Sequence, residues 1–255
     1  MTPVRAWIGF GAMAVGMFLA ILDIQIVASS LIDIQADLRI PADRLSYLQT
    51  TYLIAEVIAI AVTGWLTRAF SLRWLFTGGL IGFVIASIAC AVATTYPMLY
   101  TFRFAQGLFG GVLIPTVFSA TLLMFPRERQ TLATVIGGGL AMLAPTLGPV
   151  VGGWITETLS WHWLFLINVV PGLIAAVLVA TLVRVDKPDL ARLRRLDWLT
   201  LLLAAVALGA LELTLKEAPG RGWLSPVVLG LAMLCLASGG VAIRRWSRWG
   251  SGPDQ

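Results

Sequence analysis

The feature that most constrains this chain is a succession of long apolar runs, each long enough to cross a membrane. A helix needs about 20 apolar residues to span the hydrocarbon core of a bilayer. Eight runs qualify, at residues 7–32, 46–67, 74–94, 98–124, 132–156, 163–183, 197–215 and 225–243. The runs are apolar on every side, whereas the strands of a membrane barrel would alternate. The sequence therefore predicts an all-α integral membrane protein with about eight spans.

Composition supports this fold class and excludes most others. Hydrophobic residues make up 58% of the chain and charged residues 12%, whereas soluble domains are about a quarter charged. The net charge of +5 would suit nucleic acid, but arginines at the ends of apolar runs are better explained by orientation in a bilayer. We expect the lipid bilayer as a partner and no nucleic acid. Cys90 and Cys235 fall inside predicted spans, which favours apolar packing over a disulfide or a metal site.

The basic residues are distributed unevenly between the two sides of the predicted bundle. If the N-terminus is cytoplasmic, thirteen fall on that side: Arg5, Arg68, Arg73, Arg127, Arg129, Arg184, Lys187, Arg192, Arg194, Arg195, Arg244, Arg245 and Arg248. Four fall on the other side: Arg39, Arg44, Lys216 and Arg221. Cytoplasmic loops carry the excess of lysine and arginine, so we expect a multi-pass protein with both termini in the cytoplasm.

The longest charged connector, RVDKPDLARLRRL, follows the sixth run. It predicts a boundary between a six-helix unit and the helices that come after it. We expect a six-helix bundle over residues 1–184, a cytoplasmic connector over 185–196, two additional membrane helices over 197–243 and a cytoplasmic tail over 244–255.

Three ionisable side chains fall inside predicted spans: Asp23 in the first, Glu56 in the second and Arg103 in the fourth. Charges inside a bilayer are costly and by default mark a functional site. A carboxylate in such a site can carry protons, because burial and a nearby arginine shift its affinity for them in opposite directions. Two interpretations remain open: a proton carrier, or a static ion pair between Asp23 and Arg103 that fixes the helix packing.

Polar residues share helix faces with these charges. Gln49, Tyr52 and Glu56 follow one another at spacings of three and four, and Gln106 lies three residues after Arg103. Faces of this kind turn toward a cavity or toward one another rather than toward lipid. We expect Gln49, Tyr52 and Gln106 to face a cavity or one another.

Small residues recur at helical spacing along the fifth run, at Gly137, Ala141, Ala144, Gly148 and Gly152. A face with almost no side chains lets a neighbouring helix approach backbone to backbone. Pro145 and Pro149 each remove a backbone donor and bend a helix. The run is therefore predicted to be a kinked span with a close-packing face.

Enzyme motifs are missing from the sequence. It contains no HExxH, GxSxG or GxxxxGK[ST], and no cluster of cysteine and histidine. We expect no enzyme activity and no metal site. A membrane-embedded enzyme stays open as a rival, although nothing pairs a nucleophile with a base.

Four stretches, in the correct order, resemble the motifs of one family of transporters. LDIQIVASSLIDIQADL resembles LDxTIVNVALPxIxxxL with Asp23 on the family's aspartate, and RFAQGLFGG resembles RxxQGxGxx at Arg103 and Gln106. APTLGPVVGG resembles APxxGPxxGG, and WHWLFLINVVPG resembles WRWIFxINxPxG. On these motifs the chain resembles drug–proton antiporters of the major facilitator superfamily, of the fourteen-span EmrB/QacA type. GALELTLKEAPGRGWLS resembles the extra seventh span of that type.

The loop between the second and third runs departs from the family pattern. GWLTRAFSLRW keeps Gly64 and Arg73 of the superfamily's GxLaDRxGRR, but Arg68 stands at the usual aspartate and Ser71 at the second glycine. The resemblance implies a cytoplasmic gating loop at Gly64, Arg68 and Arg73 that lacks the family's aspartate.

The resemblance implies both a fold and a function. The fold would be the superfamily's six-helix N-terminal bundle with two additional membrane helices. The function would be proton-coupled multidrug efflux, the export of hydrophobic or cationic small molecules across the bacterial inner membrane by alternating access. The proton gradient would drive it without a cofactor, with proton coupling at Asp23, Arg103 and Glu56 and a substrate cavity at Gln49, Tyr52 and Gln106. The hinge of the antiporter motif would comprise Ala144, Pro145, Gly148, Pro149, Gly152 and Gly153.

The resemblance also implies partners. Transporters of this type need two six-helix halves around a central site, and this chain resembles one half with two further spans. We expect the N-terminal part of a longer, truncated transporter, which pairs with a C-terminal half or another subunit. In some members a periplasmic adaptor and an outer-membrane channel extend the route. The alternatives are a siderophore or metabolite exporter of the same superfamily, and a non-transporting membrane scaffold or decayed fragment.

Overall fold

The computed structural model describes residues 2–189 and 197–249, and every regular element in these ranges is a helix. Part of the predicted connector, residues 190–196, and of the predicted tail, residues 250–255, lies outside the described residues. The helices are α1 (Pro3–Ser29), α2 (Leu31–Leu38), α3 (Ala42–Leu45), α4 (Tyr47–Phe70), α5 (Leu72–Ala91), α6 (Tyr96–Met124), α7 (Arg127–Thr158), α8 (His162–Leu166), α9 (Val169–Leu182), α11 (Trp198–Arg221) and α12 (Pro226–Trp249).

Eight helical segments of the described chain are long and apolar enough to cross a membrane, with α8 and α9 together forming the sixth. The predicted all-α class and the eight predicted spans are therefore confirmed. The fifth span extends from the predicted run at 132–156 to Arg127–Thr158. The helix is longer than the run because it continues through the polar residues on either side of it.

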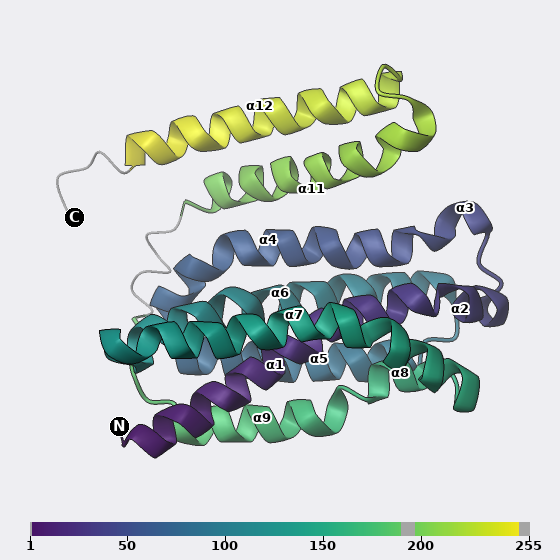
Figure 1. Cartoon of the computed structure of the whole chain (residues 1–255). Coiled ribbons are helices and arrows are strands. Elements are labelled where there is room, and N and C mark those ends of the chain that lie inside the picture. Colours follow the sequence, from purple (N-terminus) through teal and green to yellow (C-terminus); the bar gives the residue numbers. More distant parts are fainter. Residues whose placement is uncertain (1, 190–196, 250–255) are drawn as a thin grey trace.

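The helices form a bundle with a separate hairpin beside it (Figure 1). Helix α1 is the most buried of the long helices, and it packs against α6, α7 and α9. Helices α11 and α12 pair with each other, and α11 also packs against α4. We call the end of the bundle where α1 and α7 begin, and where α4 and α9 end, the basic end, since it carries Arg5, Arg68 and Arg184.

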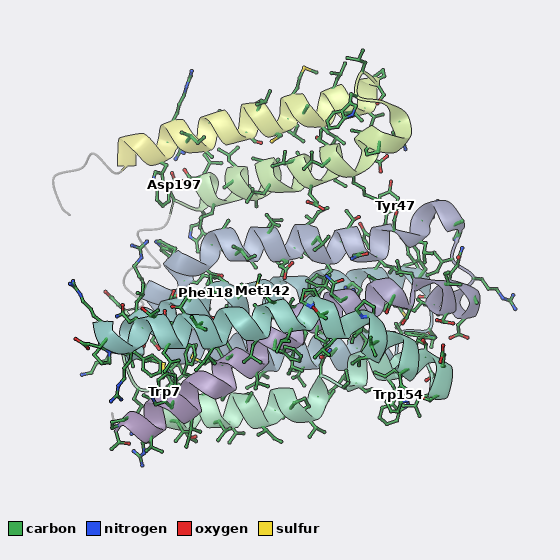
Figure 2. All side chains as sticks on the ribbon, viewed as in Figure 1. Trp7, Tyr47, Phe118, Met142, Trp154 and Asp197 are labelled. Atoms are coloured by element: carbon green, nitrogen blue, oxygen red, sulfur yellow. The ribbon has the colours of Figure 1, made fainter. Side chains whose placement is uncertain are left out.

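The outer surface of the bundle is apolar. Met142 and Trp154 project from α7 and are 79% and 61% exposed (Figure 2). Leu122 on α6 and Val177 on α9 are exposed as well. Apolar surface of this extent is unfavourable in water, and it suits the hydrocarbon core of a bilayer. The chain is a multi-pass membrane protein.

Glycines bring α4 and α6 together. A Cβ atom built on Gly107 or Gly111 of α6 would overlap the backbone carbonyl oxygen of Tyr52 or Glu56 on α4. On Gly110 it would overlap the hydroxyl of Tyr52. The two helices can therefore pack this closely only because α6 carries glycine at these positions, as small-residue stripes allow in membranes.

The predicted close-packing face of α7 meets α1. A Cβ atom on Gly148 would overlap Gln25, and one on Gly152 would overlap Ser29 and the backbone of Ile26. Further along the same face, Gly137 lies at ordinary contact distance from α1 and α6. The prediction of a close-packing face is confirmed.

The rest of the predicted hinge motif is divided between two faces of α7. Ala144 is buried on the α1 side, whereas Pro145 and Pro149 are exposed on the other side. Gly153 has open space where a Cβ would stand. The helix continues without a break through both prolines.

Hydrogen bonds link α11 to α12 and link this hairpin to α4. Asp197 caps the start of α11 by accepting a hydrogen bond from the Thr200 N–H at 3.1 Å. The Thr200 hydroxyl is the main cause that holds the pKa of Asp197 below its ordinary 3.8. Arg245 on α12 donates to the same carboxylate at 3.0 and 3.1 Å. At the opposite end, the Tyr47 hydroxyl of α4 donates to Glu217 Oε1 at 2.6 Å, which ties the hairpin to α4.

Candidate functional site

A buried ion pair joins the first and fourth spans. Arg103 Nη1 donates to Asp23 Oδ2 at 2.5 Å, and both side chains are fully buried. The two residues are 80 positions apart in sequence. Asp23 and Arg103 are therefore paired, and both interpretations, a proton carrier and a static ion pair, remain predictions.

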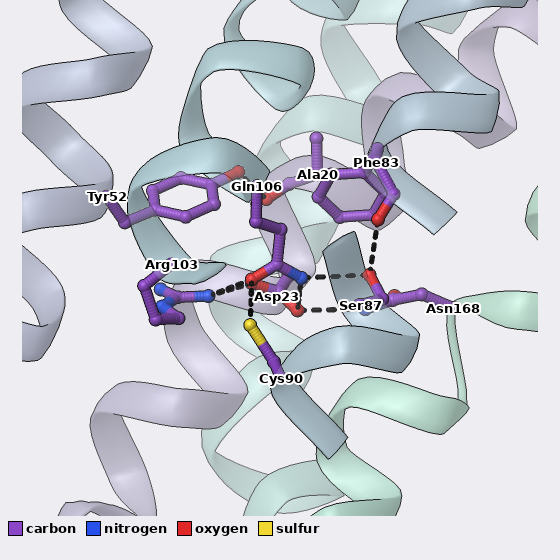
Figure 3. Close-up of polar contacts among 9 residues, drawn as sticks. All are labelled: Ala20, Asp23, Tyr52, Phe83, Ser87, Cys90, Arg103, Gln106 and Asn168. Carbon is purple, nitrogen blue, oxygen red and sulfur yellow. Dashed lines mark hydrogen bonds and ion pairs between the residues drawn. The ribbon is translucent and has the colours of Figure 1, made fainter. Parts of the chain in front are cut away.

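Two amide side chains complete the coordination of the Asp23 carboxylate (Figure 3). Its Oδ1 accepts from Gln106 Nε2 at 3.0 Å and from Asn168 Nδ2 at 2.8 Å. The Gln106 Oε1 in turn accepts from Arg103 Nη1 at 2.7 Å. A buried charge is tolerated when it is paired and its remaining lone pairs are hydrogen-bonded, and Asp23 meets both conditions.

Residues of helix α5 contact the Gln106 side chain. Gln106 Nε2 also donates to Ser87 Oγ at 2.9 Å, and the Ser87 hydroxyl donates to the Phe83 carbonyl at 2.8 Å. The buried Cys90 thiol lies 3.7 Å from Gln106 Oε1. These contacts fix the orientation of the Gln106 amide, which must present oxygen to Arg103 and nitrogen to Asp23.

Aromatic rings cover the remaining face of Arg103. Its guanidinium carbon lies 4.3 Å from the centroid of the Tyr52 ring and 5.8 Å from that of Phe165. Nε and Nη2 of Arg103 are buried and have no hydrogen-bond partner among the described residues, so the ring faces take the place of acceptors for this charge. The Tyr52 hydroxyl donates to the Ala20 carbonyl at 3.2 Å, which places the ring.

Asn168 reaches Asp23 because the sixth span is broken. Helix α8 ends at Leu166 and α9 begins at Val169. Pro171 has no N–H to donate to the Ile167 carbonyl, and it lies in the first turn of α9, where a proline is tolerated. Asn168 lies in the break and is fully buried. Asn168 was not predicted as a site residue, although an amide within the apolar stretch LFLINVV was a usable signal.

Glu56 differs from Asp23 in its surroundings. Glu56 is only 6% exposed, and its Oε1 is buried. This oxygen nevertheless has no hydrogen-bond partner among the described residues. It lies one helical turn after Tyr52 on α4. An uncoordinated carboxylate oxygen inside the bundle is a place where a proton, a water molecule or a cationic group can bind.

The residues expected to line a cavity occupy two environments. Tyr52 and Gln106 are fully buried within the cluster, whereas Gln49 is part-exposed on α4. The close packing of α4 on the α6 glycines accounts for the burial of Tyr52. Their role in binding substrate stays a prediction.

The expected gating residues lie where α4 ends and α5 begins. Gly64 has open space around it, and Arg68 is exposed near the end of α4. Arg73 lies over the ring of Trp74, with 4.5 Å between the guanidinium carbon and the ring centroid.

The described residues contain no group of three potential metal ligands.

Comparisons with known proteins give the chain a family. The family model described as Major Facilitator Superfamily matches residues 13–251. The chain is 40% identical over 241 residues to the colistin resistance protein EmrB of Acinetobacter baumannii, a match that covers 94% of this chain and 47% of that protein. It is 31% identical over 214 residues to the multidrug export protein EmrB of Escherichia coli, covering 84% of this chain and 42% of that protein. The chain thus spans about half the length of these relatives.

A solved structure shows the same fold at low identity. The chain superposes on a crystal structure of the peptide transporter POT with a TM-score of 0.63 at 16% identity, covering 88% of this chain and 48% of that one. The resemblance inferred from the sequence motifs, including its EmrB-type relatives, is confirmed.

Proposed function

We propose, from the premise that this chain belongs to the Major Facilitator Superfamily, that it is the N-terminal half of a proton-coupled multidrug exporter. Its relatives of twice the length include proteins named for colistin resistance and multidrug export. The observation that carries the proposal is the fully buried Asp23–Arg103 pair, in which a proton-accepting group lies on one helix and its counter-charge on another. Export would proceed by alternating access, driven by the proton gradient and without a cofactor.

Protonation of Asp23 would couple proton movement to helix movement. The carboxylate accepts hydrogen bonds from Arg103, Gln106 and Asn168. A proton on Asp23 removes the charge that attracts Arg103 and uses a lone pair that one of these donors occupies. The hydrogen bonds that hold α1 against α6 and against the α8–α9 break are then weakened. Proton uptake and loosening of α1 would therefore be one event.

Glu56 would take a different part in the exchange. Its free Oε1 can accept a proton without breaking any hydrogen bond among the described residues. The same oxygen can receive the positive group of a cationic substrate, which matches the expected hydrophobic or cationic class of cargo. Gln49, on the same helix, would line the route of the substrate. The glycine face of α7 would form the hinge.

The proposal extends to location and partners. Arg5, Arg68 and Arg184 gather at the basic end of the bundle, which supports an inner-membrane orientation with that end in the cytoplasm. A C-terminal half or another subunit would complete the central site. A periplasmic adaptor and an outer-membrane channel would serve as further partners if the cargo crosses the whole envelope.

Efflux in everted vesicles tests the proposal directly. The complete transporter that contains this chain would be assayed for efflux of a cationic dye with and without a pH gradient. We expect efflux to require the gradient, Asp23→Asn to abolish coupling while the protein still inserts, and Lys187→Ala to leave efflux unchanged. Efflux that ignores the gradient would contradict proton coupling.

A second candidate, a non-transporting scaffold, is favoured by one observation. Every oxygen of the Asp23 carboxylate is already hydrogen-bonded, as it would be in a static pair that fixes packing. If the pair is static, replacing both Asp23 and Arg103 by apolar residues would leave the folding and assembly of the protein intact. In an exporter the same double replacement would abolish transport. A siderophore or metabolite exporter would instead show gradient-dependent efflux of those compounds and none of the dye.

A further inference from the structure

The turn between α4 and α5 has an unfavourable backbone. Ser71 is the single residue between the two helices, with φ 68° and ψ 153°. Residues with side chains rarely adopt this region of the backbone map, which is essentially reserved for glycine. Ser71 is also 1% exposed, and its hydroxyl oxygen has no hydrogen-bond partner among the described residues. Such a conformation persists only where the surrounding structure imposes it.

The start of the connector after α9 contacts the turn on both sides of Ser71. Asp186 Oδ2 accepts a hydrogen bond from the Leu72 N–H at 2.7 Å. The Asp189 N–H donates to the Ala69 carbonyl at 2.9 Å. These two contacts lie on either side of Ser71, and they come from a segment more than a hundred residues further along the chain. We call residues 184–189 the strap.

Asp186 supplies what the turn itself lacks. Helix α5 has no acidic residue in its first turn, and Arg68 adds positive charge at the end of α4. The free N–H groups at a helix start favour a carboxylate, both as acceptor and as charge. The carboxylate arrives here from the strap and not from the turn.

We propose that the strap holds the α4–α5 turn in its strained form, with Asp186 as the positioning residue, and that lifting the strap lets the turn relax. The two hydrogen bonds from the strap hold the backbone on both sides of Ser71, so the turn cannot change its conformation while both are in place.

Hydrogen exchange of the chain in lipid nanodiscs tests the strap without any transport assay. Asp186→Ala should speed exchange of the amides at residues 70–75 by about tenfold, the effect of losing one hydrogen bond that involves a charged group. Asp186→Asn keeps an acceptor oxygen and should change exchange by less than about threefold. Lys187→Ala, the neighbouring change in the strap, should leave it unaltered. Equal exchange in the Asp186→Ala and Lys187→Ala variants overturns the proposal.

A second change separates strain from simple loss of contact. Ser71→Gly removes the backbone strain, so the turn should hold without the strap. Combined with Asp186→Ala, it should return exchange at residues 70–75 to within about threefold of the parent. If Asp186→Ala alone does not fold, the same combination should restore the folded yield. A combined variant no better than Asp186→Ala alone refutes the role of the strap in holding the strained turn.

A transport arm rests on the proposed function and fails separately from it. In the complete transporter, Asp186→Ala should alter the maximal rate of dye efflux at an unchanged half-saturating dye concentration, and Ser71→Gly should restore that rate. An unaltered rate argues against control of transport by the strap. A parent protein without efflux refutes the proposed function and leaves the exchange result standing.

Discussion

Two carboxylates lie inside the same bundle in opposite conditions. Asp23 accepts hydrogen bonds from three side chains, one of them the guanidinium of Arg103. Glu56 is nearly as buried, but its Oε1 has no partner among the described residues. The difference originates in the neighbours: α6 faces Asp23 with Arg103 and Gln106, and it meets the Glu56 stretch of α4 with glycine.

The comparison shows that burial alone does not define a functional carboxylate. A coordinated charge stabilises the packing and can be protonated only if the packing changes. An uncoordinated one contributes little to packing and is open to exchange. If this distinction is correct, replacing the two residues should affect stability very differently, and the following variants test it.

The largest effect is expected from Arg103→Met. Removal of one partner from a buried ion pair leaves the other charge uncompensated, which costs about 3–5 kcal/mol. The free energy of unfolding in mixed micelles would be measured for the purified chain. Arg68→Met, at an exposed arginine, is the matched control and should change the free energy by less than about 0.5 kcal/mol. Similar losses in both variants would show that the pair does not hold the fold.

An intermediate effect is expected from Gly148→Leu on α7. The added side chain has no space against Gln25 of α1, and overpacking of this kind costs about 1–3 kcal/mol. Gly153→Leu, five residues further along and on the open side of the same helix, should cost no more than the Arg68→Met control. The folded yield and thermal midpoint of both variants would be compared in detergent. If the two leucines are tolerated equally, the α1–α7 contact is looser than described.

The smallest effect is expected from Glu56→Gln. Because Oε1 has no hydrogen bond to lose, the free energy of unfolding should change by at most about 1 kcal/mol. In the complete transporter the same variant should lose dependence on the proton gradient, since an amide does not titrate. A large loss of stability would mean that Glu56 has a partner in the membrane, and the contrast with Asp23 would fail.

Much of the fold was predictable from the sequence because membrane helices obey a length rule. Runs of about 20 apolar residues mark spans whatever their neighbours are, and small residues at helical spacing mark a close contact. The sequence could not say that the stripe on α7 meets α1. That pairing depends on shape complementarity between residues over a hundred positions apart.

The candidate site was predictable only in part. Asp23, Glu56 and Arg103 stood out because charge is rare inside a membrane. Ser87 and Asn168 did not, since small polar residues also occur in spans as plain packing residues. The missing hydrogen bond of Glu56 is a property of the assembled bundle. The sequence shows Ser71 at a position where the family pattern has glycine. Its strained backbone and its contacts with the strap could be found only from the structure.

The position of Asp23 early in the chain has a consequence for biosynthesis. Arg103 follows 80 residues later and Asn168 follows 145 residues later. At about 5–20 residues per second, the ribosome delivers the arginine about 4–16 s after the aspartate. Throughout this interval α1 has an unpaired ionisable group within its span, and such a group costs up to about 2.5–3.5 kcal/mol, the value for the centre of a span. Until the fourth span has been synthesised, the carboxyl group of α1 has no Arg103 to pair with, and a chain that stalls in this interval holds Asp23 in the membrane without its counter-charge.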